Sequence, residues 1–249
     1  MRNLRAIFIL WLRDLKRWWY DKPRIVASLG QPLLFLFVLG TALSPSFIGP
    51  EGVNFSKFIF PGIIGMTVLF TSVFSAMSIV WDREFGFLKE VLVAPISRWS
   101  IVVGKALGGS TVAMIQGTIM FLLGPLVGIK MGFLLFLKAL LGMFLIAFAM
   151  SSLGIVIAAK IKEMEGFQVI VNFLIMPLFF LSGALFPLDR LPSWLAVLTR
   201  VDPMTYGVDF LRGVTMELNN FPLHFSFVVI VVFSLMALAI GVYEFSLED

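Results

Sequence analysis

The sequence predicts an all-α membrane protein with six transmembrane helices. Hydrophobic residues make up 59% of its 249 residues, and charged residues only 14%. Soluble domains typically contain about 45–50% apolar and about 25% charged residues. In addition, six mostly apolar stretches approach or exceed the roughly 20 residues that a helix needs to cross a bilayer. Because a soluble fold of this length cannot bury so much apolar surface, a bilayer is the expected environment.

The chain divides into one membrane domain with a leading segment and a short tail. The predicted spans cover residues 25–43, 59–81, 101–129, 139–159, 167–186 and 225–243. Twenty-four residues precede the first span, more than the short basic region of a signal peptide, so we expect a retained helix. No internal repeat is evident, and we interpret residues 1–249 as a single domain with spans within 25–243 and a tail at 244–249.

The distribution of basic residues predicts the orientation. With the N-terminus inside, the inner segments carry 13 Lys and Arg residues and the outer segments carry 6. Cytoplasmic segments of membrane proteins are enriched in these residues. We therefore expect both termini in the cytoplasm and the protein in the cytoplasmic (inner) membrane. The net charge of +4 needs no nucleic-acid partner to explain it.

Residues 1–24 have the pattern of a basic amphipathic helix. On a helical projection, the apolar face includes Trp11, Trp18 and Trp19, while Arg13 and Arg17 fall on the opposite face. Such a helix is expected to lie in the membrane interface, among the lipid headgroups. The alternative is a cytosolic helix that packs on a partner.

The segment between the fifth and sixth predicted spans contains two short apolar stretches, 194–198 and 208–216, separated by Pro203 and Gly207. We predict two short outer helices that enter the membrane and return, which requires surrounding protein or a watery cavity. An ordinary surface loop is the alternative. The residues that mark this outer re-entrant segment are Pro187, Pro192, Trp194, Pro203, Tyr206 and Arg212.

The sequence offers little catalytic chemistry. It has no cysteine and one histidine, His224, so neither a metal site nor a nucleophilic cluster is expected. The only Gly-Lys pair, Gly104-Lys105, is followed by Ala106 where a phosphate-binding loop needs Ser or Thr. We therefore expect no enzyme activity, and no cofactor, on this chain itself.

The predicted spans also lack a charge at their centres. Their main polar groups are Gln31, Gln116, Gln168 and Asn172, which are uncharged. Such groups form hydrogen bonds between helices or contact a polar part of a substrate. An ion-driven secondary transporter needs a buried group that changes charge, so this alternative is less favoured and the energy is expected to come from another protein. Small residues recur at Gly104 and Gly108, a spacing that allows close helix packing.

The inner segment between the second and third spans has the clearest pattern. Residues 82–98 read DREFGFLKEVLVAPISR. Phe85, Leu88 and Leu92 can share one face of a short helix, which Pro95 would end. A short cytoplasmic helix with exposed apolar residues predicts a protein partner, and a plain connecting loop is the alternative.

This segment resembles the ABC-2 family of exporter permeases, whose members typically carry E-R-E-x-G-T followed by [TA]-P-x-S-R. The chain departs from that form at Asp82 and Phe87. A second similarity starts at residues 186–192 and continues through DPMTY at 202–206 and LRG at 211–213, with Asp202 in place of the usual Asn.

The resemblance implies a permease that exports a lipid-like, amphipathic or glycan substrate with energy from a separate ATPase subunit, which would hold ATP and magnesium. It also implies a second permease subunit, with a homodimer expected ahead of a heterodimer, and contact with membrane lipids. The residues it assigns to a coupling helix that docks on the ATPase are Arg83, Glu84, Phe85, Gly86, Leu88, Glu90, Leu92, Pro95 and Arg98.

Overall fold

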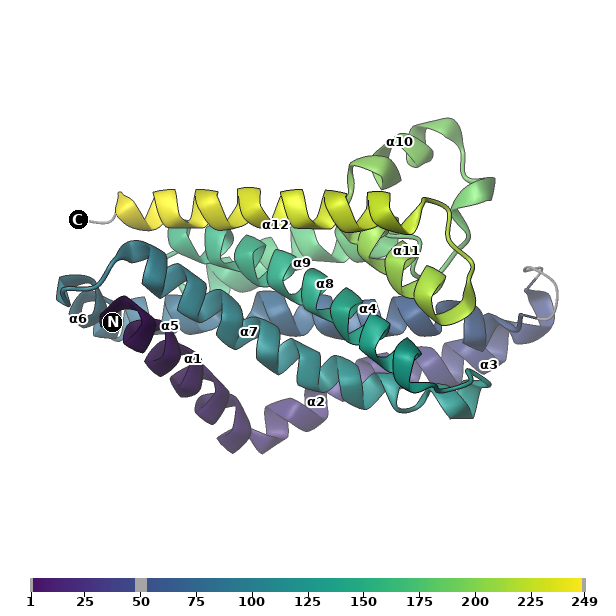
Figure 1. The fold of residues 1–249 in the computed structure, drawn as a ribbon, viewed down its shortest axis with the longest axis horizontal. Helices are drawn as coiled ribbons and strands as arrows, with labels where there is room; N and C mark the ends of the chain where they lie inside the picture. Colours follow the sequence, from purple (N-terminus) through teal and green to yellow (C-terminus); the bar gives the residue numbers. More distant parts are fainter. Residues whose placement is uncertain (1, 48–52, 248–249) are drawn as a thin grey trace.

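The computed structural model describes residues 2–47 and 53–247, and every regular element within these ranges is helical (Figure 1). The α-helices are α1 (Arg2–Tyr20), α2 (Lys22–Leu34), α3 (Gly40–Leu43), α4 (Phe55–Ser75), α5 (Met77–Glu84), α6 (Phe87–Val93), α7 (Arg98–Phe121), α8 (Phe133–Lys160), α9 (Met164–Leu181), α10 (Ser193–Val201), α11 (Pro203–Met216) and α12 (Leu223–Ser246). A π-helical turn, Phe35–Leu39, joins α2 to α3, and short 3-10 turns cover Ser44–Ser46, Gly124–Val127 and Leu188–Arg190. The structure thus confirms the all-α class.

Among the described residues, five helical segments are long and apolar enough to cross a membrane: Lys22–Ser46, Phe55–Glu84, Phe133–Lys160, Met164–Leu181 and Leu223–Ser246. The third predicted span is not one of them. Its helix, α7, is 24 residues long but carries Gly, Ser, Thr and Gln residues throughout. It packs against α4 on one side and α8 on another, so most of its surface meets protein, and such a helix can be less apolar than one that faces lipid.

The third predicted span is also too long. Helix α7 ends at Phe121, and a 3-10 turn that contains Pro125 follows. Gly128 then adopts a left-handed conformation with φ +82°, which ends the turn. The sequence from 122 to 129 is apolar enough to look like part of a span, but its proline and glycines favour a turn over a continued helix.

Helices α4, α7 and α8 form the centre of the bundle, and α11 and α12 pack on α8. Helix α11 is almost entirely buried from Met204 to Gly213. Pro203 is at its start, and the Asp202 carboxylate accepts a hydrogen bond from the Met204 backbone N–H at 2.8 Å. Gly207 does not break this helix as predicted. It lies inside α11 and leaves room for Ile146 of α8.

The two ends of the bundle differ. The start of α1, helix α6 and the end of α12 lie at one end, whereas α10 and α11 lie toward the other (Figure 1). For brevity these are called the α6 end and the α10 end. The predicted pair of short helices between the last two spans is therefore present, on the far side of the bundle from α6.

Candidate transport cavity and coupling loop

A cavity of about 870 Å³ lies between α2, α4, α7 and α9, and residues of α1 and α5 also line it. Its walls change character along the bundle. Asp14, Arg17, Asp21 and Arg24 line it near the junction of α1 and α2. Apolar side chains such as Phe70 of α4 make up much of the remaining wall. A cavity with both charged and apolar walls suits an amphipathic molecule.

The four uncharged polar residues singled out in the sequence all line this cavity: Gln31, Gln116, Gln168 and Asn172. Gln116 accepts a hydrogen bond from Thr71 Oγ1 at 2.5 Å and donates one to Ser28 Oγ at 2.9 Å. It thus joins α7 to α4 and α2, in agreement with the prediction of contacts between helices.

The other three polar residues behave differently from Gln116. Gln31, Gln168 and Asn172 are exposed, and within the described residues their side chains form no hydrogen bond. Gln168 and Asn172 are one turn apart on α9, so both amides face the cavity from the same side. These groups are free to bind a polar part of a molecule in the cavity.

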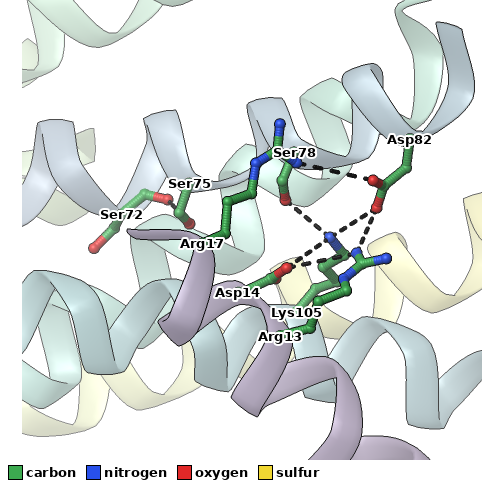
Figure 2. Close-up of polar contacts among 8 residues, drawn as sticks. All are labelled: Arg13, Asp14, Arg17, Ser72, Ser75, Ser78, Asp82 and Lys105. Carbon is green, nitrogen blue, oxygen red and sulfur yellow. Dashed lines mark hydrogen bonds and ion pairs between the residues drawn. The ribbon is translucent and has the colours of Figure 1, made fainter. Parts of the chain in front are cut away.

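A cluster of charged residues joins α1, α5 and α7 beside the cavity, which Asp14 and Arg17 line (Figure 2). The Lys105 ammonium of α7 is 4% exposed and lies 3.2 Å from Asp14 Oδ1 of α1 and 3.1 Å from Asp82 Oδ2 of α5. It also donates to Ser78 Oγ at 2.9 Å. The Arg13 guanidinium reaches Asp82 Oδ2 at 2.5 Å. The cluster therefore ties three helices together, with each acid facing two cations or more.

The charge cluster was not found in the sequence because its members lie far apart along the chain. The expectation that charge is absent holds for the middle of the spans but not for this end, where Lys105 and Asp82 are buried. One feature of the sequence could have indicated the charge cluster. Asp14 is the only acid among the first 20 residues, and it shares a helix with Arg13 and Arg17.

Helix α1 packs along α7, and small residues of α7 make room for it. A Cβ atom at Gly104 would lie 3.1 Å from Leu10 Cβ, and one at Gly108 would lie 3.2 Å from Asp14 Cβ. The predicted role of this spacing in close packing is thus seen in the structure. The helix follows the path of α7 at the α6 end of the bundle (Figure 1).

The face of α1 that packs is not the predicted apolar face. Ala6 and Leu10 are its buried residues, whereas Trp11, Trp18 and Trp19 mark the predicted apolar face. Of the residues predicted for the membrane interface, Trp11 donates from Nε1 to Thr111 Oγ1 at 2.9 Å, Arg13 binds Asp82, and Arg17 and Trp18 line the cavity. Trp19 is 65% exposed, and Arg17 is also exposed although it lines the cavity. Charged residues lie on the packed side because their partners are buried charges.

The inner loop forms a short helix, α6, as its pattern indicated. Gly86 begins it with φ +79°, a left-handed conformation that costs glycine little, and the helix stops before Pro95. Phe85 is 69% exposed and Val93 83%, but Leu88 is only 3% exposed and belongs to the core. Leu88 is therefore not available to a partner, which corrects the expected common face with Phe85 and Leu92. Helix α6 packs on α5, and its Leu88 is part of the core cluster.

Other residues expected to face the ATPase are also engaged within the chain. Arg83 donates to the backbone oxygens of Ala158, Ala159 and Ile161 at the end of α8, with 2.7 Å to Ala158. Arg98 donates to the Leu92 backbone oxygen at 2.7 Å. Glu84, Glu90 and Pro95 are exposed. The open surface of the loop thus consists of Glu84, Phe85, Gly86, Phe87, Lys89, Glu90, Val93 and Pro95.

The residues expected to mark the outer segment lie in or next to its two helices, and two of them form hydrogen bonds there. Pro192 precedes α10, and Trp194 in that helix is 66% exposed. Tyr206 of α11 donates to the Arg200 backbone oxygen at 2.7 Å. Arg212, fully buried, donates to the Gly183 backbone oxygen at 2.7 Å and lies 4.3 Å from the centre of the Phe58 ring. Pro187 precedes the 3-10 turn that leads to α10.

Comparison with known proteins identifies the family. Residues 5–216 match the model of the ABC-2 type transporter family. The chain is 32% identical over 192 residues to the transport permease ycf38 of Cyanophora paradoxa, covering 76% of this chain and 66% of that protein. It is 27% identical over 190 residues to nodulation protein J of Rhizobium leguminosarum bv. viciae, covering 76% of this chain and 73% of that protein.

A third relative is the multidrug ABC transporter permease YbhR of Escherichia coli strain K12, at 27% identity over 172 residues. The match covers 66% of this chain but only 45% of YbhR. The chain thus spans under half of YbhR, and with 66% of ycf38 it spans just under two thirds of that relative. The family match covers most of the chain, including the charge cluster, the cavity helices up to α9, and α11. The chain therefore belongs to the ABC-2 type transporter family of permeases.

Proposed function

We propose that this chain is the membrane subunit of an ATP-driven ABC exporter that moves an amphipathic or lipid-like molecule across the cytoplasmic membrane. The observation that carries the proposal is the cavity with three unpaired amides, Gln31, Gln168 and Asn172, beside apolar walls. Such a cavity provides hydrogen bonds to a polar headgroup and apolar contact to a chain or ring. One relative is named a multidrug permease and another a nodulation protein, and neither name fixes the substrate of this chain.

The exposed apolar sides of α2 and α9 support a second permease subunit. Val26 of α2 is 72% exposed and Phe173 of α9 is 86% exposed, and both helices border the cavity. Exposed amides at the same border would be costly in lipid, so a second copy that encloses the cavity and keeps lipid away from them is favourable. We propose a homodimer, ahead of a heterodimer, with six spans in each copy when α7 is counted.

In this proposal the α6 end faces the cytoplasm, as the distribution of Lys and Arg predicts. The surface around Phe85 and Val93 docks on a separate ATPase, whose ATP and magnesium supply the energy. The exposed apolar side of α1, with Leu4 and Phe8, rests on the inner membrane surface. At the α10 end, Trp194 and its neighbours dip into the outer half of the membrane.

The test is to purify the tagged chain from its native membrane, identify the bound subunit, and reconstitute the complex in phosphatidylcholine vesicles. ATP should drive movement of a dye-labelled phospholipid or an amphipathic dye. Asn172→Leu should lower that rate several-fold, because its amide lines the cavity, whereas Leu235→Ala, on α12 and outside the cavity lining, should not. Purification without an ATPase, or transport equally fast without ATP, would refute the proposal.

The charge cluster favours one alternative, an ion-driven carrier, because Lys105 is a buried ionisable group. The two functions differ in their driving force. A carrier would move the probes in vesicles with a proton or sodium gradient and no ATP, and the exporter would not.

A further inference from the structure

The charged residues that line the cavity gather at one end of it. The Arg17 guanidinium lies 4.9 Å from the centre of the Trp81 ring of α5. The Arg24 guanidinium donates to the Phe74 backbone oxygen, near the end of α4, at 3.0 Å. Phe70 and Met66, earlier in α4, line the cavity farther from α5. Because α5 leads into α6, the charged end of the cavity is the one toward the α6 end of the bundle.

Two of the unpaired amides lie at the same end. Gln168 and Asn172 line the cavity from α9, a helix that packs on both α4 and α5. Farther along α9, the Phe179 ring lies 6.2 Å from the Phe70 ring, measured between centres. The two amides precede that contact in α9 and are therefore on its α5 side, where Arg17 also lies. They add uncharged hydrogen-bonding groups to the charged end.

The acids in this part of the wall already have partners. The Asp14 carboxylate lies 3.2 Å from the Lys105 ammonium and 3.5 Å from Arg13 Nη2. Asp21 caps α2, since its Oδ1 accepts from the Arg24 backbone N–H at 3.3 Å. Neither acid forms an ion pair with the Arg17 or Arg24 guanidinium within the part of the chain that the structure describes.

The two arginines, in contrast, have most of their donors free. Among the described residues, the Arg17 side chain forms no hydrogen bond, and its one ion pair, with Asp82 Oδ1, is 3.9 Å long (Figure 2). The hydrogen bond to Phe74 is the one that the Arg24 side chain forms there. A guanidinium carries five N–H donors. Both side chains are exposed and line the cavity, so this end offers unused positive donors to a ligand.

Resting on the proposed function, we propose that Arg17 and Arg24 bind the phosphate group of an amphiphilic substrate, and that this group selects the substrate of the cavity. Guanidinium donors form a fork that matches the oxygens of a phosphate. Stacking on Trp81 occupies the face of the Arg17 guanidinium and leaves its edge, where the donors lie, open. Gln168 and Asn172 contact the remaining polar atoms of the headgroup.

The apolar wall accounts for the rest of such a molecule. Met66 and Phe70 line the cavity beyond the charged end and provide contact for an acyl chain. An amphiphile in the inner half of a membrane has its headgroup toward the cytoplasm and its chain toward the middle of the bilayer. With the α6 end in the cytoplasm, as proposed, it enters the cavity with the phosphate already directed to the two arginines.

A cationic amphiphile fits this end less well. It would face the positive charges of Arg17 and Arg24, and Asp14 and Asp21 are already engaged. The sign of the headgroup charge is therefore the property that the test must vary, with the apolar chain kept constant.

The first measurement compares three dye-labelled probes with one common acyl chain: a lysophosphatidic acid, a monoacylglycerol and a trimethylammonium derivative. Each is titrated into the complete complex with its ATPase, in a neutral detergent and without nucleotide. The phosphate probe should bind about ten-fold or more tightly than the monoacylglycerol, because hydrogen bonds to charged groups are the stronger ones. The ammonium probe should bind no better than the neutral one. Equal affinities for all three, or strongest binding of the ammonium probe, would overturn the inference.

The second measurement assigns the preference to the two arginines. Arg17→Gln combined with Arg24→Gln should remove most of the preference for phosphate and leave the affinity for the monoacylglycerol as in the parent. The matched control is Lys16→Gln combined with Lys22→Gln, which removes two exposed charges from the same two helices at positions that do not line the cavity. This control should keep the full preference. Loss of the preference in the lysine variant, or its retention in the arginine variant, would contradict the assignment.

Inorganic phosphate separates a lipid headgroup from the free ion. It should displace the lysophosphatidic acid probe only at concentrations far above those of the unlabelled lipid, because it lacks the acyl chain. Displacement at similar concentrations would show a site for free phosphate and overturn the inference of an amphiphile. In vesicles, ATP-driven transport that favours the neutral or ammonium probe would leave the proposed function intact and refute this inference, whereas no ATP-driven transport of any probe would contradict the proposed function itself.

Discussion

The Lys105 ammonium lies 3.2 Å from Asp14 Oδ1, although 91 positions separate the two residues along the chain. Helix α1 has the composition of a membrane-surface helix, but through this contact it packs as part of the bundle. The contact also places a buried cation next to a cavity whose remaining polar groups include three unpaired amides. The energetic consequences of the contact can be measured separately from transport.

The first prediction concerns the stability of the charge cluster. Lys105→Met should lower the free energy of unfolding by about 3–5 kcal/mol, because it leaves Asp14 and Asp82 buried with fewer cations. Adding Asp14→Asn should recover part of that loss, since one of the uncompensated charges is removed. Thermal unfolding of the purified protein in detergent gives the four corners of this double-mutant cycle. Strictly additive effects would show that the two side chains do not interact.

The second prediction concerns the close approach of α4 to the segment after α9. A Cβ atom at Gly62 would lie 2.5 Å from the Ala184 backbone oxygen and 2.7 Å from its Cα. Because the Ala184 backbone cannot rotate away as a flexible side chain can, Gly62→Ala should destabilise the protein by about 1–3 kcal/mol. Gly30→Ala is the matched control, since a Cβ there meets nothing within 4 Å. Equal melting temperatures for the two variants would contradict the described packing.

The helices themselves were largely predictable, because apolar runs of about 20 residues have few other uses. Predicted spans such as 139–159 and 225–243 lie within α8 and α12. The side of each helix that packs was harder to predict. Helix α1 shows why: its packed face contains Leu10, Arg13 and Asp14, and a charge belongs there only because Lys105 and Asp82 lie opposite. Helical periodicity contains no information about partners from distant segments.

The site could be predicted in its residues but not in its arrangement. Gln31, Gln116, Gln168 and Asn172 stand out as polar groups in apolar stretches, yet their meeting in one cavity depends on how α2, α7 and α9 pack. For Leu88 the sequence pattern predicted the wrong exposure. Its spacing with Phe85 and Leu92 fits a shared face, but in the structure Leu88 packs into the core and Phe85 does not.

The third prediction follows from that burial. Leu88→Asp should prevent stable folding, because it places a charge in the core. Val93→Asp, on the same helix but 83% exposed, should leave folding intact and weaken binding of the ATPase in the proposed complex. Thermal unfolding and copurification of the ATPase separate the two effects. Normal ATPase binding by Val93→Asp and by Phe85→Asp would show that the surface around these two residues does not bind the ATPase.

The fourth prediction concerns pH. Burial raises the pKa of the Asp202 carboxyl from 3.8 to about 7, against the opposing effect of its hydrogen bonds to Met204 and Thr205. The folded protein therefore favours the protonated acid. This contribution to stability is complete below the ordinary pKa and is lost as the pH rises through about 7.

Asp202→Asn keeps a residue that caps helices well but carries no charge. Its melting temperature should match that of the parent at about pH 4 and exceed it at about pH 8, because only the parent then bears the cost of ionisation. Asp189→Asn, at an exposed acid of the same segment, serves as the control and should follow the parent. Parallel curves for Asp202→Asn and the parent would show that this carboxyl does not govern the pH dependence.

The most direct test of the central claim is the accessibility of the cavity in the two states of the cycle. Asn172→Cys introduces a single thiol in the cavity of a chain that has no cysteine, and Leu235→Cys on α12 provides a control outside the cavity lining. A membrane-impermeant thiol reagent is added from the cytoplasmic or the opposite side of vesicles that contain the permease and its ATPase. The account predicts that Asn172→Cys reacts from the cytoplasmic side without nucleotide and from the opposite side after trapping with ATP and vanadate, while Leu235→Cys does not change. Identical reactivity of Asn172→Cys in both states would contradict an ATP-driven transport cavity at this position.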